Sequence, residues 1–208
     1  LLDANLKGLD QRGGGVLVSE TGVTLDLNGG TLVNRDGGLI ATPGALLLRQ
    51  LGAVDNGAGG EISSDRAFTL AAASLDNRGG KVIGDSGLRL TVQRLLNQAK
   101  GVLAGRDGLS LDGSELFNGD GGRLDSQNGL SVSLGGVLDN QGGALVSEGS
   151  LTARAARLDN RGGTFSSAGA LALTSQAALD NQGGRLLSDA GVTLKGASLD
   201  NSRSGVIS

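Results

Sequence analysis

The sequence predicts an all-β protein, a right-handed parallel β-helix of about ten rungs with roughly 21 residues and three short strands in each rung. Three observations favour this fold class. One short motif, Leu-Asp-Asn-x-Gly-Gly and its variants, recurs at a nearly constant interval. Apolar residues fall at equivalent places in each repeat. The chain has 39 Gly and only three Phe, and it lacks the Trp, Tyr, Met and Cys side chains that fill irregular cores.

The asparagine of the motif marks the repeat. Successive intervals between these positions are 23, 22, 21, 20, 21, 22, 20, 21 and 20 residues. The repeat therefore predicts a single segment over residues 1–208, with no room for a second domain. The chain starts at Leu1 without a visible signal peptide, so we expect an interior segment of a longer filament. The motif positions, with glutamine in the first, are Gln11, Asn34, Asn56, Asn77, Asn97, Asn118, Asn140, Asn160, Asn181 and Asn201.

Aligning the repeats on this position reveals columns. An apolar residue stands two places before each motif position, another follows the glycine pair, and a small residue comes two places later. A further stretch alternates apolar and polar residues, as in Leu88 and Leu90, which indicates a strand with one buried face. The apolar column after the glycines contains Leu17, Ile40, Ile62, Val82, Leu103, Leu124, Leu145, Phe165, Leu186 and Ile207.

These columns predict three strands of about 3 to 5 residues that close a triangular rung. A helical fold is excluded because glycine and β-branched residues occur in every window. A leucine-rich repeat is excluded because its Leu-x-x-Leu-x-Leu spacing and helical return are missing. Parallel crossovers are right-handed in about 98% of cases, which predicts the hand.

The asparagine and the glycines are explained by the sharp corner that the chain must turn. Positive φ is reached most easily by glycine and asparagine, so we expect both residue types to supply it. Stacked asparagine amides can also hydrogen-bond from rung to rung. Because each rung buries its apolar face only against its neighbours, we expect the end rungs to be continued or capped in the native protein.

Charge and hydropathy exclude several partners. The 18 Lys and Arg residues and the 21 Asp and Glu residues are scattered, so no basic stripe follows a phosphate backbone and nucleic acid is not expected. Apolar runs are too short for a membrane-spanning helix. The absence of cysteine means that no disulfide has to form during export.

The motif copies Leu75-Asp76-Asn77-Arg78-Gly79-Gly80 and Leu179-Asp180-Asn181-Gln182-Gly183-Gly184 resemble the haemagglutinin repeats of filamentous haemagglutinin-type exoproteins. That family includes large adhesins and the toxin-delivery proteins of contact-dependent growth inhibition in Gram-negative bacteria. The resemblance implies secretion through a dedicated outer-membrane transporter by two-partner secretion, and a β-helical rod outside the outer membrane. It covers the whole chain. Variant corners follow Asn34, Asn56 and Asn97, and we expect them to change the corner without removing a rung.

The aspartate before the motif asparagine forms a candidate site, because closely spaced carboxylates can bind Ca²⁺ or act as an acid/base pair in a glycosidase. Its recurrence at the same corner favours a different role, in which each aspartate accepts hydrogen bonds from nearby backbone N–H groups. We therefore predict no metal and no cofactor. The aspartate column, whose side chains we expect to point outward, contains Asp10, Asp55, Asp76, Asp139, Asp159, Asp180 and Asp200.

Catalysis is the competing function class, because parallel β-helices include polysaccharide lyases and hydrolases. A chain without Trp, Tyr or His lacks aromatic platforms for sugar rings and the commonest general base. Its serines have no histidine partner, and Gly13-Gly14-Gly15 lacks the Lys-Ser/Thr of a phosphate-binding loop. We therefore predict no catalytic residues and no enzyme. A polysaccharide-degrading enzyme or a carbohydrate-binding module is the alternative.

Two residues depart from the aspartate column. Leu96 and Phe117 replace aspartate on adjacent rungs, where both should point outward as an exposed contact patch for a partner or for another part of the filament. The alternative is that the pair packs under a neighbouring corner. The outward position of the alternating strand is mostly Thr or Ser but is interrupted by Leu47, Arg89 and Ala172, so strand propensity explains this column better than a dedicated flat array does.

The combined prediction is a rigid extracellular stalk that presents an adhesive, receptor-binding or toxin-bearing region to neighbouring cells. Its expected partners are the outer-membrane transporter and a target-cell receptor that other regions of the parent chain would bind. If this segment itself binds a target, its few aromatic residues predict weak or multivalent contacts.

Overall fold

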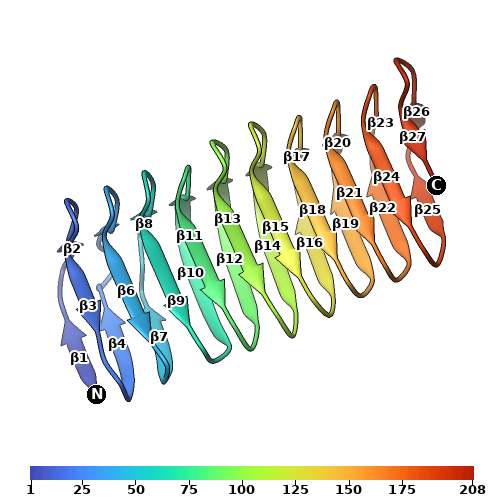
Figure 1. Cartoon of the computed structure of the whole chain (residues 1–208). Coiled ribbons are helices and arrows are strands. Elements are labelled where there is room, and N and C mark those ends of the chain that lie inside the picture. Colours follow the sequence, from blue (N-terminus) through green and yellow to red (C-terminus); the bar gives the residue numbers. More distant parts are fainter.

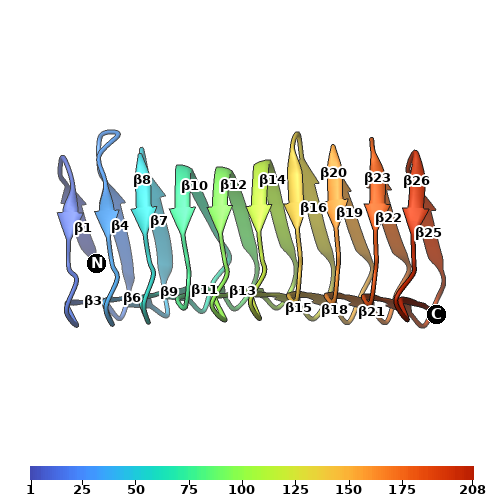
Figure 2. The same cartoon turned by 90° about the horizontal axis from the view of Figure 1, so that it is seen from above.

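The computed structural model describes all of residues 1–208 and consists of 27 β-strands with no helix. The strands coil into a parallel β-solenoid of ten rungs, stacked in sequence order from the N-terminus to the C-terminus (Figure 1). Figure 2 shows the same rungs from above, with equivalent strands following one another along the stack. The predicted fold class is therefore confirmed. The chain contains no helix with the length and hydropathy needed to cross a membrane.

The strand after each motif corner builds a continuous wall, which we call the third wall. It is a ten-stranded parallel sheet in which each strand pairs with its equivalents in the neighbouring rungs. Successive residues of the apolar column pair with each other in adjacent rungs; Val82, for example, pairs with Leu103. Its strands are β3 (Val16–Val18), β6 (Leu39–Thr42), β9 (Glu61–Ser64), β11 (Lys81–Gly84), β13 (Val102–Gly105), β15 (Arg123–Ser126), β18 (Ala144–Ser147), β21 (Thr164–Ser167), β24 (Arg185–Ser188) and β27 (Val206–Ile207).

The first wall carries the alternating stretch of each rung. In the fourth, fifth and sixth rungs its strand continues straight into the second wall, so one strand of nine residues replaces the two short ones that the sequence predicts. These long strands are β10 (Phe68–Asp76), β12 (Leu88–Leu96) and β14 (Leu109–Phe117). The remaining strands are β1 (Leu2–Asn5), β4 (Gly22–Asp26), β7 (Ala45–Arg49), β16 (Leu130–Leu134), β19 (Leu151–Ala155), β22 (Leu171–Ser175) and β25 (Val192–Lys195).

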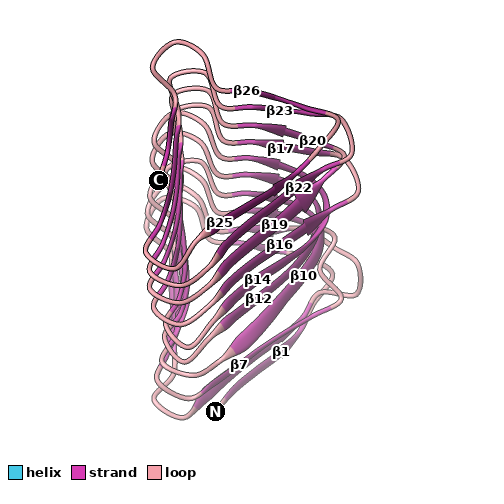
Figure 3. Ribbon diagram, turned by 90° about the vertical axis from the view of Figure 1, so that its right-hand side faces the viewer, coloured by secondary structure: helices cyan, strands magenta, loops and turns pink.

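The second wall leads into the motif corner and ends at its aspartate in most rungs. Besides the second halves of the three long strands, it contains β2 (Leu9–Asp10), β5 (Leu32–Val33), β8 (Ala53–Asp55), β17 (Val137–Asp139), β20 (Arg157–Asp159), β23 (Ala178–Asp180) and β26 (Ser198–Asp200). Figure 3 looks toward the C-terminal end and shows the three walls enclosing the interior.

The interior is a single apolar core. Side chains of the predicted columns point into it and stack on themselves, and 37 buried apolar residues form one continuous cluster. Phe165 is fully buried there in the column that is otherwise aliphatic. Small and medium aliphatic side chains fill this core because each meets the same residue type above and below it.

Candidate functional site

The motif asparagines form a column of hydrogen-bonded amides inside the corner, which we call the asparagine ladder. From Asn34 onward each Nδ2 donates to the Oδ1 of the asparagine in the next rung at 2.7–2.8 Å, and Gln11 Nε2 starts the ladder with a 2.6 Å bond to Asn34. The eight asparagines from Asn34 to Asn181 have no exposed surface. The predicted rung-to-rung amide bonds are confirmed, and they give the asparagines a structural role.

The ladder amides also satisfy the backbone of the corner. Asn56 Nδ2 donates to the carbonyl oxygens of Gly60 and Lys81 as well as to Asn77 Oδ1. No buried side-chain nitrogen or oxygen in the protein lacks a hydrogen-bond partner. A buried amide without partners would cost about 1–3 kcal/mol, so this complete pairing is what makes a polar column tolerable in the core.

One expectation about the corner is wrong, because the motif asparagines do not supply the positive φ. The residue two places later does, as at Gly79 with a φ of 68°. In the longer corners two successive residues have positive φ, and after Asn97 these are Ala99 and Lys100, with φ of 51° and 65°. These variant corners remove no rung, as predicted, since β13 still pairs with both of its neighbours.

The last glycine of each corner is required by space. Gly80 does not have positive φ, but a Cβ there would lie 1.9 Å from the Asn56 carbonyl oxygen and 2.8 Å from Asn77 Oδ1. The same holds at Gly143, where the Asn118 carbonyl oxygen would be 1.9 Å away. The glycine pair therefore combines two requirements, one for backbone conformation and one for close approach to the ladder.

The aspartate column caps the outside of the same corner. In all seven rungs that carry it, Oδ1 accepts a hydrogen bond of 3.0–3.2 Å from the backbone N–H two residues later. The structure thus confirms the role in backbone capping. No three His, Cys, Asp or Glu side chains are grouped so that they could hold a metal ion.

The residue after the motif asparagine adds a second contact to this aspartate, which our sequence analysis missed. Arg78 Nε donates to Asp76 at 2.9 Å, and Gln182 Nε2 donates to Asp180 at 3.3 Å. The Asp-Asn-Arg and Asp-Asn-Gln variants of the motif could have predicted this contact, because each places a side-chain donor two residues after the aspartate. Asp159 is 2% exposed because Arg157 and Arg161 pair with its carboxylate and cover it.

Hydrogen bonds at the corner lower the pKa of three aspartates of the column. The side-chain and backbone hydrogen bonds from Arg12 hold the pKa of Asp10 below its ordinary value. Burial raises the pKa of Asp76, but the hydrogen bonds from Arg78 outweigh it and the net shift is downward. The hydrogen bonds from Ser202 lower the pKa of Asp200. All three carboxylates are therefore ionised near neutral pH and suit capping rather than general acid chemistry.

Leu96 and Phe117 lie side by side, since strand pairing places them at the same position of β12 and β14. Both are partly exposed. The guanidinium carbon of Arg94 lies 5.3 Å from the centre of the Phe117 ring, and Arg94 Nη1 lies 3.6 Å from Glu115 Oε2. The surface defined by Leu96, Phe117 and Arg94, which we call the contact patch, is therefore apolar, and its one cation is paired with Glu115.

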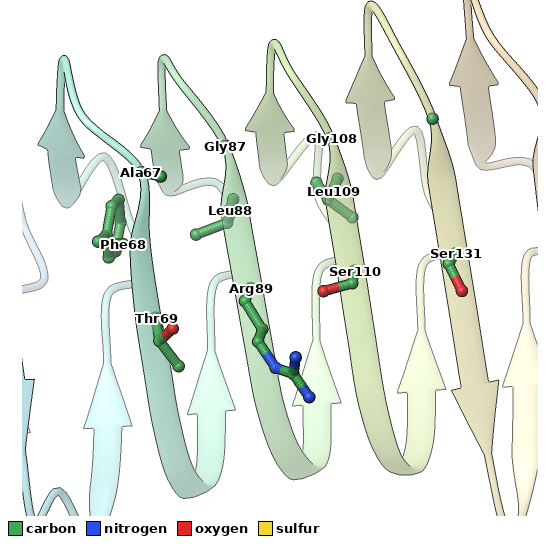
Figure 4. Close-up of a pocket in the computed structure, with 11 residues that line it drawn as sticks. Ala67, Phe68, Thr69, Gly87, Leu88, Arg89, Gly108, Leu109, Ser110 and Ser131 are labelled. Carbon is green, nitrogen blue, oxygen red and sulfur yellow. The ribbon is translucent and has the colours of Figure 1, made fainter.

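The outward row of the first wall lines a shallow hollow of about 490 Å³ over β10, β12, β14 and β16. Figure 4 shows Thr69, Arg89, Ser110 and Ser131 following one another along this row. Gly87 and Gly108 come immediately before β12 and β14, where the absence of side chains makes the surface low. The hollow contains one charged residue and no carboxylate, so it lacks the acid/base pair of a glycosidase.

A parallel solenoid with an internal amide ladder and capped corners defines a repeat protein whose recurring residues stabilise the coil itself. The model of the haemagglutinin repeat matches residues 1–50, 41–99, 94–142, 130–183 and 178–208. The chain therefore belongs to the haemagglutinin repeat family, a structural, adhesin-type repeat of filamentous haemagglutinin-like proteins and not an enzyme family. Comparisons with curated proteins and with solved structures give no match.

Proposed function

We propose that this chain is a stiff spacer in a secreted filament, which holds an adhesive, receptor-binding or toxin-bearing region away from the producing cell. The asparagine ladder, which runs without interruption from Gln11 to Asn201, is the observation that carries the proposal. Together with the ten-stranded third wall it ties every rung to the next. Membership of an adhesin-type repeat family supports the same role.

The proposed place of action is outside the outer membrane of a Gram-negative bacterium, reached through a two-partner secretion transporter. Two properties suit this route. Every strand pairs only with strands of adjacent rungs, so rungs can add one at a time as the chain emerges. The chain also has no cysteine, so folding at the surface needs no disulfide formation.

Deleting whole rungs from the full-length parent exoprotein tests the spacer role. Removing residues 119–160 joins Asn118 to Arg161, which preserves the repeat register and shortens the rod by two rungs. Removing residues 119–150 is the matched control, because it deletes about one and a half rungs and breaks the register. We expect the first variant to be secreted and to retain target-cell binding, and the second to lose surface display.

A second in-register deletion separates spacing from binding. Removing residues 78–118 also deletes about two rungs, but it takes away the contact patch with Leu96 and Phe117. A pure spacer predicts equal binding by the two in-register variants, measured as the number of target cells bound per displayed filament. Loss of binding only without residues 78–118 would assign the contact to the patch, and loss in both would reject the spacer role.

A further inference from the structure

One wall of the solenoid is interrupted between the third and fourth rungs. The first wall starts as a separate three-stranded sheet of β1, β4 and β7, and no ladder joins β7 to β10. In the later rungs the first inward residue of this wall donates its N–H to the next rung, as Phe68 does to the Gly87 carbonyl and Leu88 to the Gly108 carbonyl. The equivalent bond from Leu46 to Ala67 is absent. We call the facing stretches Ala45–Arg49 and 67–71 the seam.

The seam has a physical cause in the sequence. Val54 lies eight positions after Leu46 in the third rung, but Leu75 lies only seven positions after Phe68 in the fourth. The third rung leaves β7 through Gln50, which has a φ of 50°, whereas β10 runs straight on to Asp76. Where one strand bends and its neighbour runs straight, the two can separate, and here pairing is kept only where β8 meets β10.

A similar change of length occurs between the sixth and seventh rungs without a break. There β14 pairs with both β16 and β17, and the extra residue falls at Gly135 and Gly136. The seam is therefore not an unavoidable result of changing rung length. It also contains an apolar cleft of about 260 Å³ between β7 and β10. Leu47, which lines this cleft, is 43% exposed and is the one large apolar side chain outside the terminal rungs with such exposure.

We propose that the seam is a built-in flexible joint, at which the rod bends by opening the first wall between the third and fourth rungs. The other two walls act as the hinge, because β6 pairs with β9 and β8 pairs with β10 across the same step. Bending toward those walls separates β7 from β10 without breaking a hydrogen-bonded ladder. At every other step of the first wall, the same motion would have to break the bonds that join adjacent strands.

Site-resolved hydrogen exchange of the whole chain tests this joint. In a parallel ladder alternate amides face each neighbour, so the amides of Leu46 and Leu48 in β7 and of Thr69 and Ala71 in β10 face the seam. We expect them to exchange at least about tenfold faster than those of Arg89 and Thr91, which face β10 from the intact side. Equal protection of the two groups would overturn the proposal.

A disulfide clamp provides the second measurement. Leu47→Cys with Thr69→Cys spans the seam, and Thr69→Cys with Arg89→Cys spans the adjacent paired step in register. Oxidation of the first pair should slow exchange at the four seam amides by about tenfold, while oxidation of the control pair leaves them unchanged. Seam amides that stay as fast in the oxidised clamp as in the reduced protein would show that their exchange does not come from opening of the wall.

Discussion

Each buried asparagine is held by bonds in two directions, along the stack through its amide and across the corner through backbone carbonyls. Asn118, for example, donates to Asn140 Oδ1 and to the Gly122 carbonyl, and it accepts from Asn97. Because the core is apolar, water cannot replace a hydrogen bond that is lost there. Removing one amide therefore affects three rungs.

We expect Asn118→Ala to lower the free energy of unfolding by about 2–3 kcal/mol, since it removes the ladder acceptor of Asn97 Nδ2 and the ladder donor to Asn140 Oδ1 in the core. Asn201→Ala is the matched control at an exposed asparagine and should cost less than about 1 kcal/mol. Guanidinium unfolding followed by circular dichroism measures both. Equal costs would mean that burial does not strengthen the ladder.

The aspartate column gives a pH-dependent contribution on the outside of the corner. The folded pKa of Asp76 lies below its ordinary value, so ionised Asp76 stabilises the fold above about pH 4, and this contribution is lost as the pH falls through the folded pKa. Asp76→Asn keeps an oxygen for the Arg78 N–H but removes the ion pair. We expect it to cost less than about 1 kcal/mol at pH 7, because solvent screens this surface pair.

The difference between wild type and Asp76→Asn should shrink when unfolding is repeated near pH 3. Asp139→Asn is the control, because Asp139 contacts neutral Gln141 and its substitution removes no ion pair. A difference for Asp76→Asn that stays constant from pH 7 to pH 3 would contradict the assigned charge contribution.

At the scale of the element, the corner depends on two glycines with different roles. Gly142 has a φ of 69° and open space where a Cβ would stand, while Gly143 lies against the Asn118 carbonyl. The first position tolerates other residues at some cost, as Ala58 shows with a φ of 47° in the corner after Asn56. The second position requires the absence of a side chain.

We therefore expect Gly142→Ala to cost about 1–2 kcal/mol through backbone strain alone. Gly143→Ala should cost at least about 3 kcal/mol, because the ladder and the preceding corner must move apart to admit the methyl group. Thermal unfolding of the two variants gives the comparison directly. The reverse order would show that conformation, and not space, selects the glycine pair.

Much of each rung could be predicted from the sequence because the same residues recur at the same positions in every repeat. The ladder, the inward columns and the aspartate caps all follow from residues that recur at a fixed interval. The nine-residue strands could not be predicted, since continuing straight from Leu70 to Leu75 depends on the absence of a bend and no single residue signals it. The seam was missed for a similar reason, because the same change of rung length opens the first wall at one step and leaves it paired at another, and no single residue signals which.

At the scale of the whole molecule, burial is a property of neighbouring rungs. Leu179 and Leu199 occupy the same column, but Leu179 is 1% exposed between two rungs whereas Leu199 is 45% exposed in the last one. Stability in such a stack is approximately the sum of the rungs and of the interfaces between them. The rod can therefore change in length by whole rungs with little change in its local structure, as the deletion experiment requires.

The ladder also gives the rod a direction. Every amide donates toward the C-terminal end and accepts from the N-terminal side, so the dipoles of successive side chains are aligned and add along the axis. Rotating a single amide by 180° would set two oxygens against each other on one side and two NH₂ groups on the other. All amides of the column therefore share one orientation. The ladder has a net dipole along the axis, with an amide oxygen at the N-terminal end and an amide NH₂ group at the C-terminal end.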